Sequence, residues 1–177
     1  MNILEVKTRN LYIDFDGVIM NTIDVTYEEL KAKGLNVKSP ENAEQIRNFY
    51  ATIDWNELLN KKAKIINDAI ECIKKIIDSK KFNVSILTHV TTLNEAVEKV
   101  NYLRKYMNGI TIIPVPREVS KTSMVETKNA ILIDDYAGNL EEWEKCNGIG
   151  IKFSIELKGK GFPVINRLDQ ILDLNLA

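Results

Sequence analysis

Four short apolar runs, each ending next to a polar residue, constrain the fold of this chain more than any other feature. They are rich in Ile, Val and Leu and comprise Asn10–Ile13, Val84–Leu87, Ile110–Val115 and Ala130–Ile133. Runs of this length and composition are typical of strands buried on both faces of a parallel sheet. A fifth run, Gly148–Phe153, is predicted as a further strand, although its two glycines weaken the pattern.

The stretches between these runs carry apolar residues at every third or fourth position, which predicts amphipathic helices. The clearest are Asn67–Ser79 and Leu93–Met107, and shorter candidates are Leu140–Cys146 and Asn166–Leu174. Strands that alternate with helices predict right-handed crossovers and an α/β fold with a doubly wound parallel sheet.

One interval departs from this alternation. From Met20 to Ile66 the chain has 47 residues before the next core helix, which is too long for an ordinary connection. Helical patterns occur in it at Thr26–Lys33, Glu41–Tyr50 and Asp54–Ile66. We therefore predict a core formed by residues 1–19 and 67–177, with a small helical cap, residues 20–66, inserted after the first strand.

Composition excludes several classes of function. The chain has 24 basic and 25 acidic residues among 177, so no basic excess points to a nucleic-acid polymer as partner. No apolar stretch is long enough to cross a membrane or to resemble a signal peptide. Cys72 and Cys146 lack metal-site spacing, and we expect both to be buried thiols of a cytoplasmic protein. Nothing in the sequence indicates the oligomeric state.

Polar side chains follow three of the predicted strands directly. They are Asp14 and Asp16 after the first, Thr88 and His89 after the second, and Asp134 and Asp135 after the fourth. The carboxyl ends of parallel strands meet at one edge of the sheet, so these groups should converge. Four carboxylates so close together repel one another unless a cation neutralises them, and oxygen ligands favour Mg²⁺. The alternative is that each Asp only caps a loop or helix.

In their order and spacing these residues resemble the motifs of the haloacid dehalogenase (HAD) superfamily of phosphohydrolases. Ile13–Val18 matches the first motif, Ser85–Thr88 the second and Ile131–Asp135 the fourth. The third motif is a lysine, for which Lys121 and Lys128 both qualify by position. We favour Lys121, because Lys128 directly precedes the fourth strand and should lie at its amino end, away from the site.

The resemblance implies a role for each matched residue. Asp14 would be the nucleophile that forms an aspartyl-phosphate, and Asp16 would protonate the leaving oxygen and later activate water. Thr88 and Lys121 would bind the phosphoryl group. The implied cofactor is Mg²⁺, with Asp134, Asp135, Asp14 and the backbone carbonyl of Asp16 as its ligands.

The resemblance also indicates a substrate class, a small phosphorylated metabolite. The chain looks closest to the 5′(3′)-deoxyribonucleotidase-like group, because of its short cap, Thr88 and the Ile133–Trp143 stretch. This predicts a 5′-nucleotidase, with His89 and Asn21 as further substrate contacts. The cap aromatics Phe49, Tyr50 and Trp55 could stack on a base or form the core of the cap.

Three other functions compete with this prediction. One is a phosphatase for sugar phosphates or other small metabolites, and another is an inactive phosphate- or nucleotide-binding protein. The third is a receiver-like domain, which the Asp-x-Asp spacing and the long insertion disfavour.

Overall fold

Six parallel strands form one sheet in the computed structural model, which describes residues 8–175. The strands are β1 (Arg9–Ile13), β2 (Phe82–Val90), β3 (Thr111–Pro116), β4 (Ile131–Asp134), β5 (Ile149–Phe153) and β6 (Val164–Ile165). Their order across the sheet is β3-β2-β1-β4-β5-β6, with β1 at the centre. Ile13 of β1 pairs with Ile86 of β2 and with Ile133 of β4, so the residues just past these three positions lie side by side. Thr88 and His89 were expected to follow the second strand but belong to it, because β2 continues to Val90 in its pairing with β3.

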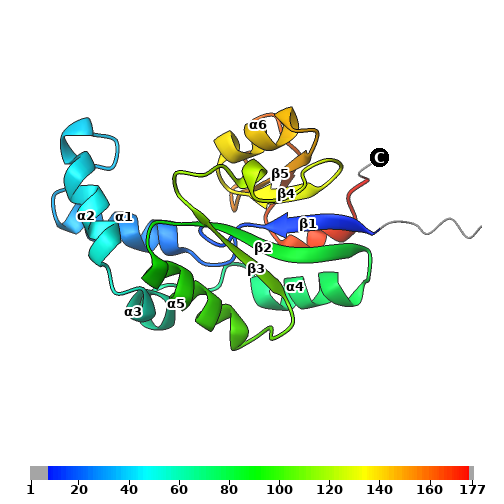
Figure 1. Cartoon of the computed structure of the whole chain (residues 1–177), viewed down its shortest axis with the longest axis horizontal. Coiled ribbons are helices and arrows are strands. Elements are labelled where there is room, and N and C mark those ends of the chain that lie inside the picture. Colours follow the sequence, from blue (N-terminus) through cyan, green and yellow to red (C-terminus); the bar gives the residue numbers. More distant parts are fainter. Residues whose placement is uncertain (1–7, 176–177) are drawn as a thin grey trace, which may run out of the picture.

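Helices cover both faces of this sheet, as Figure 1 shows. The helices α4 (Ala69–Asp78) and α5 (Leu93–Arg104) lie on one side, and α6 (Ala137–Lys145) lies on the other. Along β1, Leu11 and Ile13 belong to the core under α4 and α5, whereas Tyr12 packs with Trp143 of α6. Burial on both faces explains the continuous apolar runs of the sequence and confirms the predicted doubly wound α/β fold.

The segment between β1 and α4 is helical, and it extends beyond the sheet in Figure 1. It contains α1 (Thr22–Ala32), a 3₁₀ turn (Pro40–Asn42), α2 (Ala43–Thr52), and α3 (Trp55–Glu57), which continues into a π turn (Leu58–Lys62). The two ends of the segment meet, because Met20 pairs with Ile65 and the Asn21 N–H donates to the Lys64 carbonyl at 3.1 Å. That this insertion acts as a cap stays a prediction.

Several predicted elements differ from those observed. The third helix of the insertion, expected over Asp54–Ile66, ends at Lys62, because the following residues return in extended form to pair with Met20. The helix expected over Asn166–Leu174 is a 3₁₀ helix, Leu168–Leu172. β6 was not predicted, since two residues are too few to show a pattern. Cys72 is buried as expected, but Cys146 is exposed, so that prediction is wrong.

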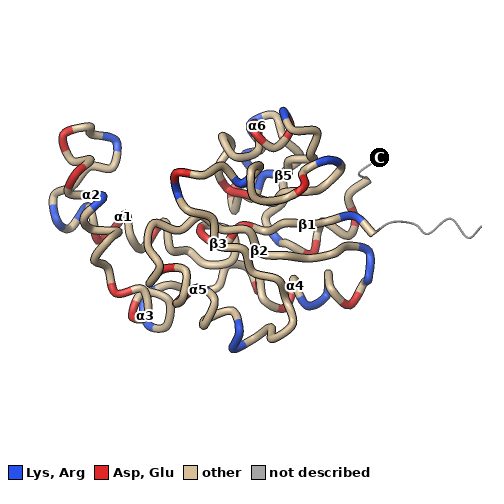
Figure 2. The backbone as a smooth tube through the Cα atoms, in the orientation of Figure 1, with Lys and Arg blue, Asp and Glu red and all other residues tan. Residues whose placement is uncertain are grey.

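Charged residues of both signs are distributed over the described chain in Figure 2. None of the helices in the described range is long and apolar enough to cross a membrane. Residues 1–7, on which the expectation of no signal peptide rests, lie outside the described residues.

The packing of Trp143 against Gly148 gives a test of the core. Trp143 is fully buried and its indole N–H donates to the Ala130 carbonyl at 3.0 Å. A Cβ atom at Gly148 would lie 2.3 Å from the indole ring. We expect Gly148→Ala to lower the free energy of unfolding by about 1–3 kcal/mol, because the buried ring must move.

Urea denaturation measures this change, and Gly109→Ala is the matched control. A Cβ atom at Gly109 meets no atom within 4 Å, so the control should stay within about 0.5 kcal/mol of the wild type. Equal effects of the two substitutions would contradict the packing described here.

Candidate active site

Asp14 lies at the carboxyl end of the central strand and is held there by the sheet. Its backbone N–H donates to the Ile133 carbonyl at 2.9 Å, and its side chain is buried. The Lys121 Nζ lies 2.8 Å from Asp14 Oδ1 and 2.7 Å from Asp134 Oδ2. Lys121 reaches this position from a 3₁₀ turn (Lys121–Ser123) that follows β3, and it is also buried. One ammonium therefore joins the ends of β1 and β4.

Three carboxylates gather around this ammonium. Oxygen atoms of Asp14, Asp134 and Asp135 all lie within 4.8 Å of one another. Asp134 is fixed, because its Oδ1 accepts from the Tyr136 N–H at 2.8 Å and its Oδ2 from the Asn139 amide at 2.9 Å. Lys121 offsets one of the three charges, and Lys152 of β5 lies near Asp135, so negative charge still exceeds positive charge when all three groups are ionised.

This excess is reflected in the pKa values. Burial, together with the neighbouring carboxylates, raises the pKa of Asp14 to about 8, although Lys121 opposes the shift. Burial and Asp134 likewise raise the pKa of Asp135 to about 7. A divalent cation would stabilise the ionised forms, and a set of three carboxylate ligands suits Mg²⁺. The donors present therefore fit the metal that the sequence predicts.

Gly17 makes room for one of these carboxylates. Its φ of +72° lies in the left-handed region, and a Cβ atom there would lie 2.4 Å from Asp135 Oδ2. No other residue type combines this backbone conformation with so close an approach. The Gly of the Asp-x-Asp-Gly motif is thus required by the position of Asp135.

Asp16 belongs to a second group of contacts. Its Oδ1 accepts from the Thr22 hydroxyl at 2.6 Å, and its Oδ2 from Lys99 Nζ at 2.5 Å. Thr88 Oγ1 lies 3.4 Å from the same Oδ2 and is fully buried. Asp16 is not among the carboxylates of the three-residue cluster, so only its backbone carbonyl remains as a predicted metal ligand.

Two buried lysines near the site were not found by sequence reasoning. Lys99, in the middle of α5, contacts Asp16, and Lys152 of β5 donates to the backbone carbonyl of Asp135. A signal for Lys99 does exist in the sequence. It lies three residues after Ala96 and four before Leu103, on the apolar face of a helix where a lysine is unusual.

The other predicted residues have different surroundings. His89 Nε2 lies 3.0 Å from the Val119 carbonyl, and burial lowers the pKa of the ring, so the neutral form donates this bond at pH 7. Asn21 Oδ1 accepts from the Lys64 N–H at 2.6 Å, closing the inserted segment, and Asn21 lines neither of the cavities described below. Lys128 is exposed and has no contact with the acidic cluster.

Two adjoining cavities open above these groups. The first, about 600 Å³, is lined by Asp14, Asp135 and His89, together with Asn139 of α6. The second, about 320 Å³, lies under the inserted segment and is lined by residues of α1, α2 and α3. Asp16 lines both cavities and therefore stands at their junction.

Comparison with solved structures identifies the fold. A HAD-superfamily hydrolase of subfamily IA from Geobacter sulfurreducens superposes with a TM-score of 0.59 at 14% identity, covering 94% of this chain and 99% of that one. A hydrolase from Pseudomonas syringae gives a TM-score of 0.61 at 14% identity, over 93% and 96% of the two chains. The fold is that of the HAD hydrolases.

A third solved structure has the same fold. A predicted phosphoglycolate phosphatase from Haemophilus somnus superposes with a TM-score of 0.58 at 9% identity, over 96% and 98% of the two chains. No protein-family model and no curated protein sequence matches the chain. At these identities the HAD likeness establishes the architecture, and the chemistry has to be argued from the site.

The raised pKa values predict how Mg²⁺ affects stability. Because Asp14 and Asp135 bind protons more tightly when folded, their ionisation destabilises the metal-free protein as the pH rises from about 4 to about 8. Mg²⁺ competes with these protons, so it should stabilise more strongly at pH 8 than at pH 5.5. At about 100 times its Kd, we expect Mg²⁺ to raise Tm by about 5–10 °C at pH 8.

Thermal unfolding with and without Mg²⁺ at the two pH values provides the measurement. Asp135→Asn is the comparison variant, since it removes one charge without touching Lys121. Its Mg²⁺-dependent shift should be clearly smaller. A shift of the same size at both pH values would argue against a metal site at this cluster.

Proposed function

We propose that this protein is a Mg²⁺-dependent phosphatase that hydrolyses a small phosphate monoester through an aspartyl-phosphate on Asp14. One observation carries the proposal. A buried carboxylate at the base of an open cavity lies 2.8 Å from an ammonium and within 4.8 Å of two further carboxylates. This arrangement combines a nucleophile with the positive charge that phosphoryl transfer requires. The HAD fold is consistent with it.

The proposed reaction has two steps. The Asp14 carboxylate attacks phosphorus, the bond from phosphorus to the ester oxygen breaks, and Asp16 gives its proton to the leaving alcohol. Asp16 then takes a proton from the water that attacks the aspartyl-phosphate, which releases inorganic phosphate and regenerates Asp14. Lys121 neutralises charge on Asp14 and on the transferred group. Mg²⁺, held by Asp14, Asp134 and Asp135, would supply further positive charge at the phosphate.

The position of Asp16 supports this division of labour. It stands between the cavity above Asp14, which we assign to the phosphate, and the cavity under the inserted segment, which we assign to the leaving group. The ester oxygen joins these two halves of the substrate. A proton donor for that oxygen is needed where the cavities meet.

The second cavity favours a small leaving group over a large one. At about 320 Å³ it lies at the lower end of ligand pockets, and Tyr27, Tyr50 and Trp55 line it. Phe49 does not line it; its ring packs edge-on against Tyr50 at 5.3 Å, so it belongs to the core of the insertion. The 5′-nucleotidase activity suggested by the sequence stays a prediction.

A specific observation favours the alternative of a small-metabolite phosphatase, and within it a metabolite whose leaving group is acidic. Arg47 and Arg117 both line the second cavity, Arg117 at its border with the first, and neither guanidinium forms an ion pair or hydrogen bond with another residue between positions 8 and 175. Three carboxylates, those of Asp16, Glu95 and Glu118, also line this cavity. Lys99 pairs with Asp16 and Glu95, so Glu118 is the lining carboxylate without an ion pair among residues 8–175. Arginine pairs well with carboxylate and phosphate, whereas the nucleoside released from a nucleotide is uncharged. A leaving group that carries an anionic group of its own could pair with these arginines.

The first test is phosphate release from p-nitrophenyl phosphate. Asp14→Asn should reduce the Mg²⁺-dependent rate to background, because the nucleophile is lost. Lys121→Ala should lower kcat/KM by about 10²–10⁴, as expected for loss of a group that stabilises transition-state charge.

Lys128→Ala is the matched control, because Lys128 is the exposed alternative for the same motif. It should keep activity within about twofold of the wild type. Full activity in Asp14→Asn would remove the proposed mechanism.

The second test identifies the leaving group with a substrate panel. Nucleoside monophosphates, neutral sugar monophosphates, and monoesters that carry a carboxylate or a second phosphate should be compared by kcat/KM. We expect the acidic substrates to be preferred, and Arg47→Ala to lower kcat/KM for them by about tenfold, or about 1.4 kcal/mol. Because Arg47 lines only the second cavity, neutral esters should change little in this variant. Preference for nucleotides would instead support the nucleotidase.

A further inference from the structure

Among residues 8–175, Lys99 is the most deeply buried charged group that the proposed mechanism does not use. Its side chain comes from the middle of α5 and has no solvent exposure. The Nζ lies 2.5 Å from Asp16 Oδ2, 2.7 Å from Glu95 Oε1, 3.0 Å from the His89 carbonyl and 3.2 Å from Thr88 Oγ1. Lys99 lines neither cavity, so it would not contact substrate directly.

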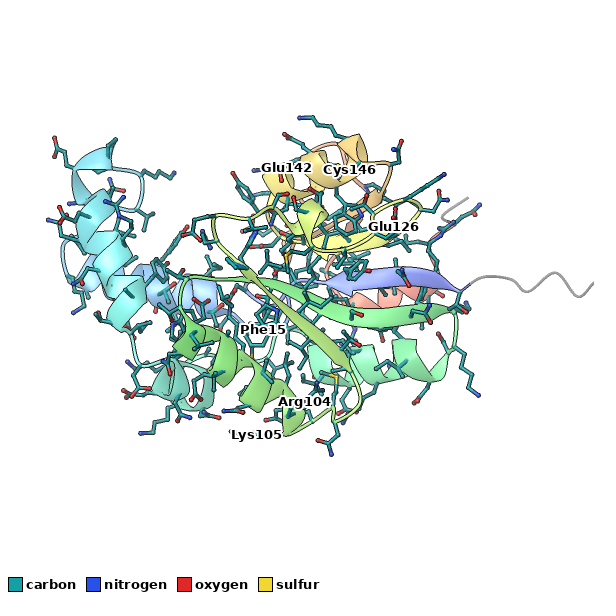
Figure 3. All side chains as sticks on the ribbon, viewed as in Figure 1. Phe15, Arg104, Lys105, Glu126, Glu142 and Cys146 are labelled. Carbon is teal, nitrogen blue, oxygen red and sulfur yellow. The ribbon has the colours of Figure 1, made fainter. Side chains whose placement is uncertain are left out.

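Burial of an ammonium is costly unless its charge and its donors are satisfied. Lys99 meets both conditions, through two carboxylates and through the rings of Phe15 and Trp55, whose centroids lie 5.4 Å and 5.2 Å from Nζ. Figure 3 labels Phe15 between the end of β1 and α5. Because so many groups from different elements enclose it, the position of Nζ is strongly fixed.

Glu95 anchors the other side of Lys99. Its second oxygen accepts from the Thr91 N–H at 2.7 Å, and its own N–H donates to the Thr92 hydroxyl at 3.1 Å. Both bonds belong to the start of α5. The rigid first turn of the helix therefore holds Glu95, and Glu95 holds Lys99 one turn later.

This chain of contacts ends at Asp16. With Lys99 on Oδ2 and Thr22 on Oδ1, both carboxylate oxygens have a partner, so the side chain is fixed at the junction of the two cavities. Lys99 also donates to Thr88 Oγ1. The hydroxyl hydrogen of Thr88 therefore points away from Lys99, toward Asp16 Oδ2 or the His89 carbonyl. One ammonium thus orients two side chains to which sequence reasoning assigned roles in the reaction.

We infer that Lys99 is a positioning residue, which with Glu95 holds the Asp16 carboxyl group against the oxygen that leaves with the substrate alcohol. This inference rests on the proposed function of Asp16 as proton donor. If Lys99 positions Asp16, the loss of activity on removing Lys99 should be larger for leaving groups that need a proton. If the Lys99–Glu95 pair were only structural, the loss would be the same for all leaving groups.

The experiment measures kcat/KM for phosphate monoesters with leaving groups of different basicity. This constant reports the steps up to formation of the aspartyl-phosphate, in which the leaving group departs. For Lys99→Met we expect a loss of about 10² on alkyl phosphates, which need general-acid assistance. For 2,4-dinitrophenyl phosphate, whose leaving group departs without a proton, we expect a loss of less than about threefold. Asp16→Asn should show the same pattern.

A double variant and a control complete the test. If Lys99 acts through Asp16, adding Lys99→Met to Asp16→Asn should cause no further loss on alkyl phosphates. Lys105→Met is the control, since Lys105, labelled in Figure 3 beyond the end of α5, contacts Asn60 through a hydrogen bond and the ring of Tyr102 but does not contact Asp16. It should leave every ester unchanged.

The possible failures are distinguishable. Equal loss on all esters in a folded Lys99→Met protein would overturn the inference and leave a structural role. A wild type that cleaves none of the esters would overturn the proposed function instead. If Lys99→Met does not fold, Glu95→Gln carries the test, with an expected loss of about three- to tenfold on alkyl phosphates only; a uniform loss there would equally overturn the inference.

Discussion

The whole site depends on the contact of the buried Lys121 ammonium with Asp14 and Asp134. Without a cation between them, carboxylates at the ends of β1 and β4 would repel each other across adjacent strands, at the centre of the sheet. With it, Asp14 can be buried and still face an open cavity. The Lys121 contact offsets repulsion only in part, and the remaining negative charge is what makes the cluster suitable for a divalent cation.

Parallel pairing is what makes this arrangement predictable from sequence. Because Ile13 is in register with Ile86 and Ile133, the residues just past these three positions must lie together at one edge of the sheet. The same reasoning distinguishes Lys121 from Lys128. Lys121 comes after β3, at the end of the sheet where the site lies, whereas Lys128 comes before β4, at the opposite end. The doubly wound fold was predictable for a related reason: strands buried on both faces leave continuous apolar runs, which few other elements produce.

The features of the fold and the site that could not be predicted from sequence depend on the direction of a side chain or on contacts between residues far apart in the chain. The partner of Asp16 is Lys99, 83 residues away, and only the phase of α5 places that lysine toward the site. Asn21 follows the first motif, but its side chain serves the closure of the insertion, because Lys64 returns beside it. β6 is defined by its pairing with β5 rather than by its two residues. Local patterns contain little information on such contacts.

The two buried lysines divide the acidic groups between two environments. Lys121 stabilises the carboxylates that would meet the phosphate and the metal, while Lys99 stabilises the one that would meet the leaving group. If a single cation served all of them, Asp16 would be drawn toward Asp14 and away from the junction of the cavities. Separate partners let two carboxylates only two positions apart in sequence keep different orientations. The Asp-x-Asp spacing places them at the same strand end. The two lysines, one from the turn after β3 and one from α5, hold Asp14 in the acidic cluster and Asp16 at the junction of the cavities.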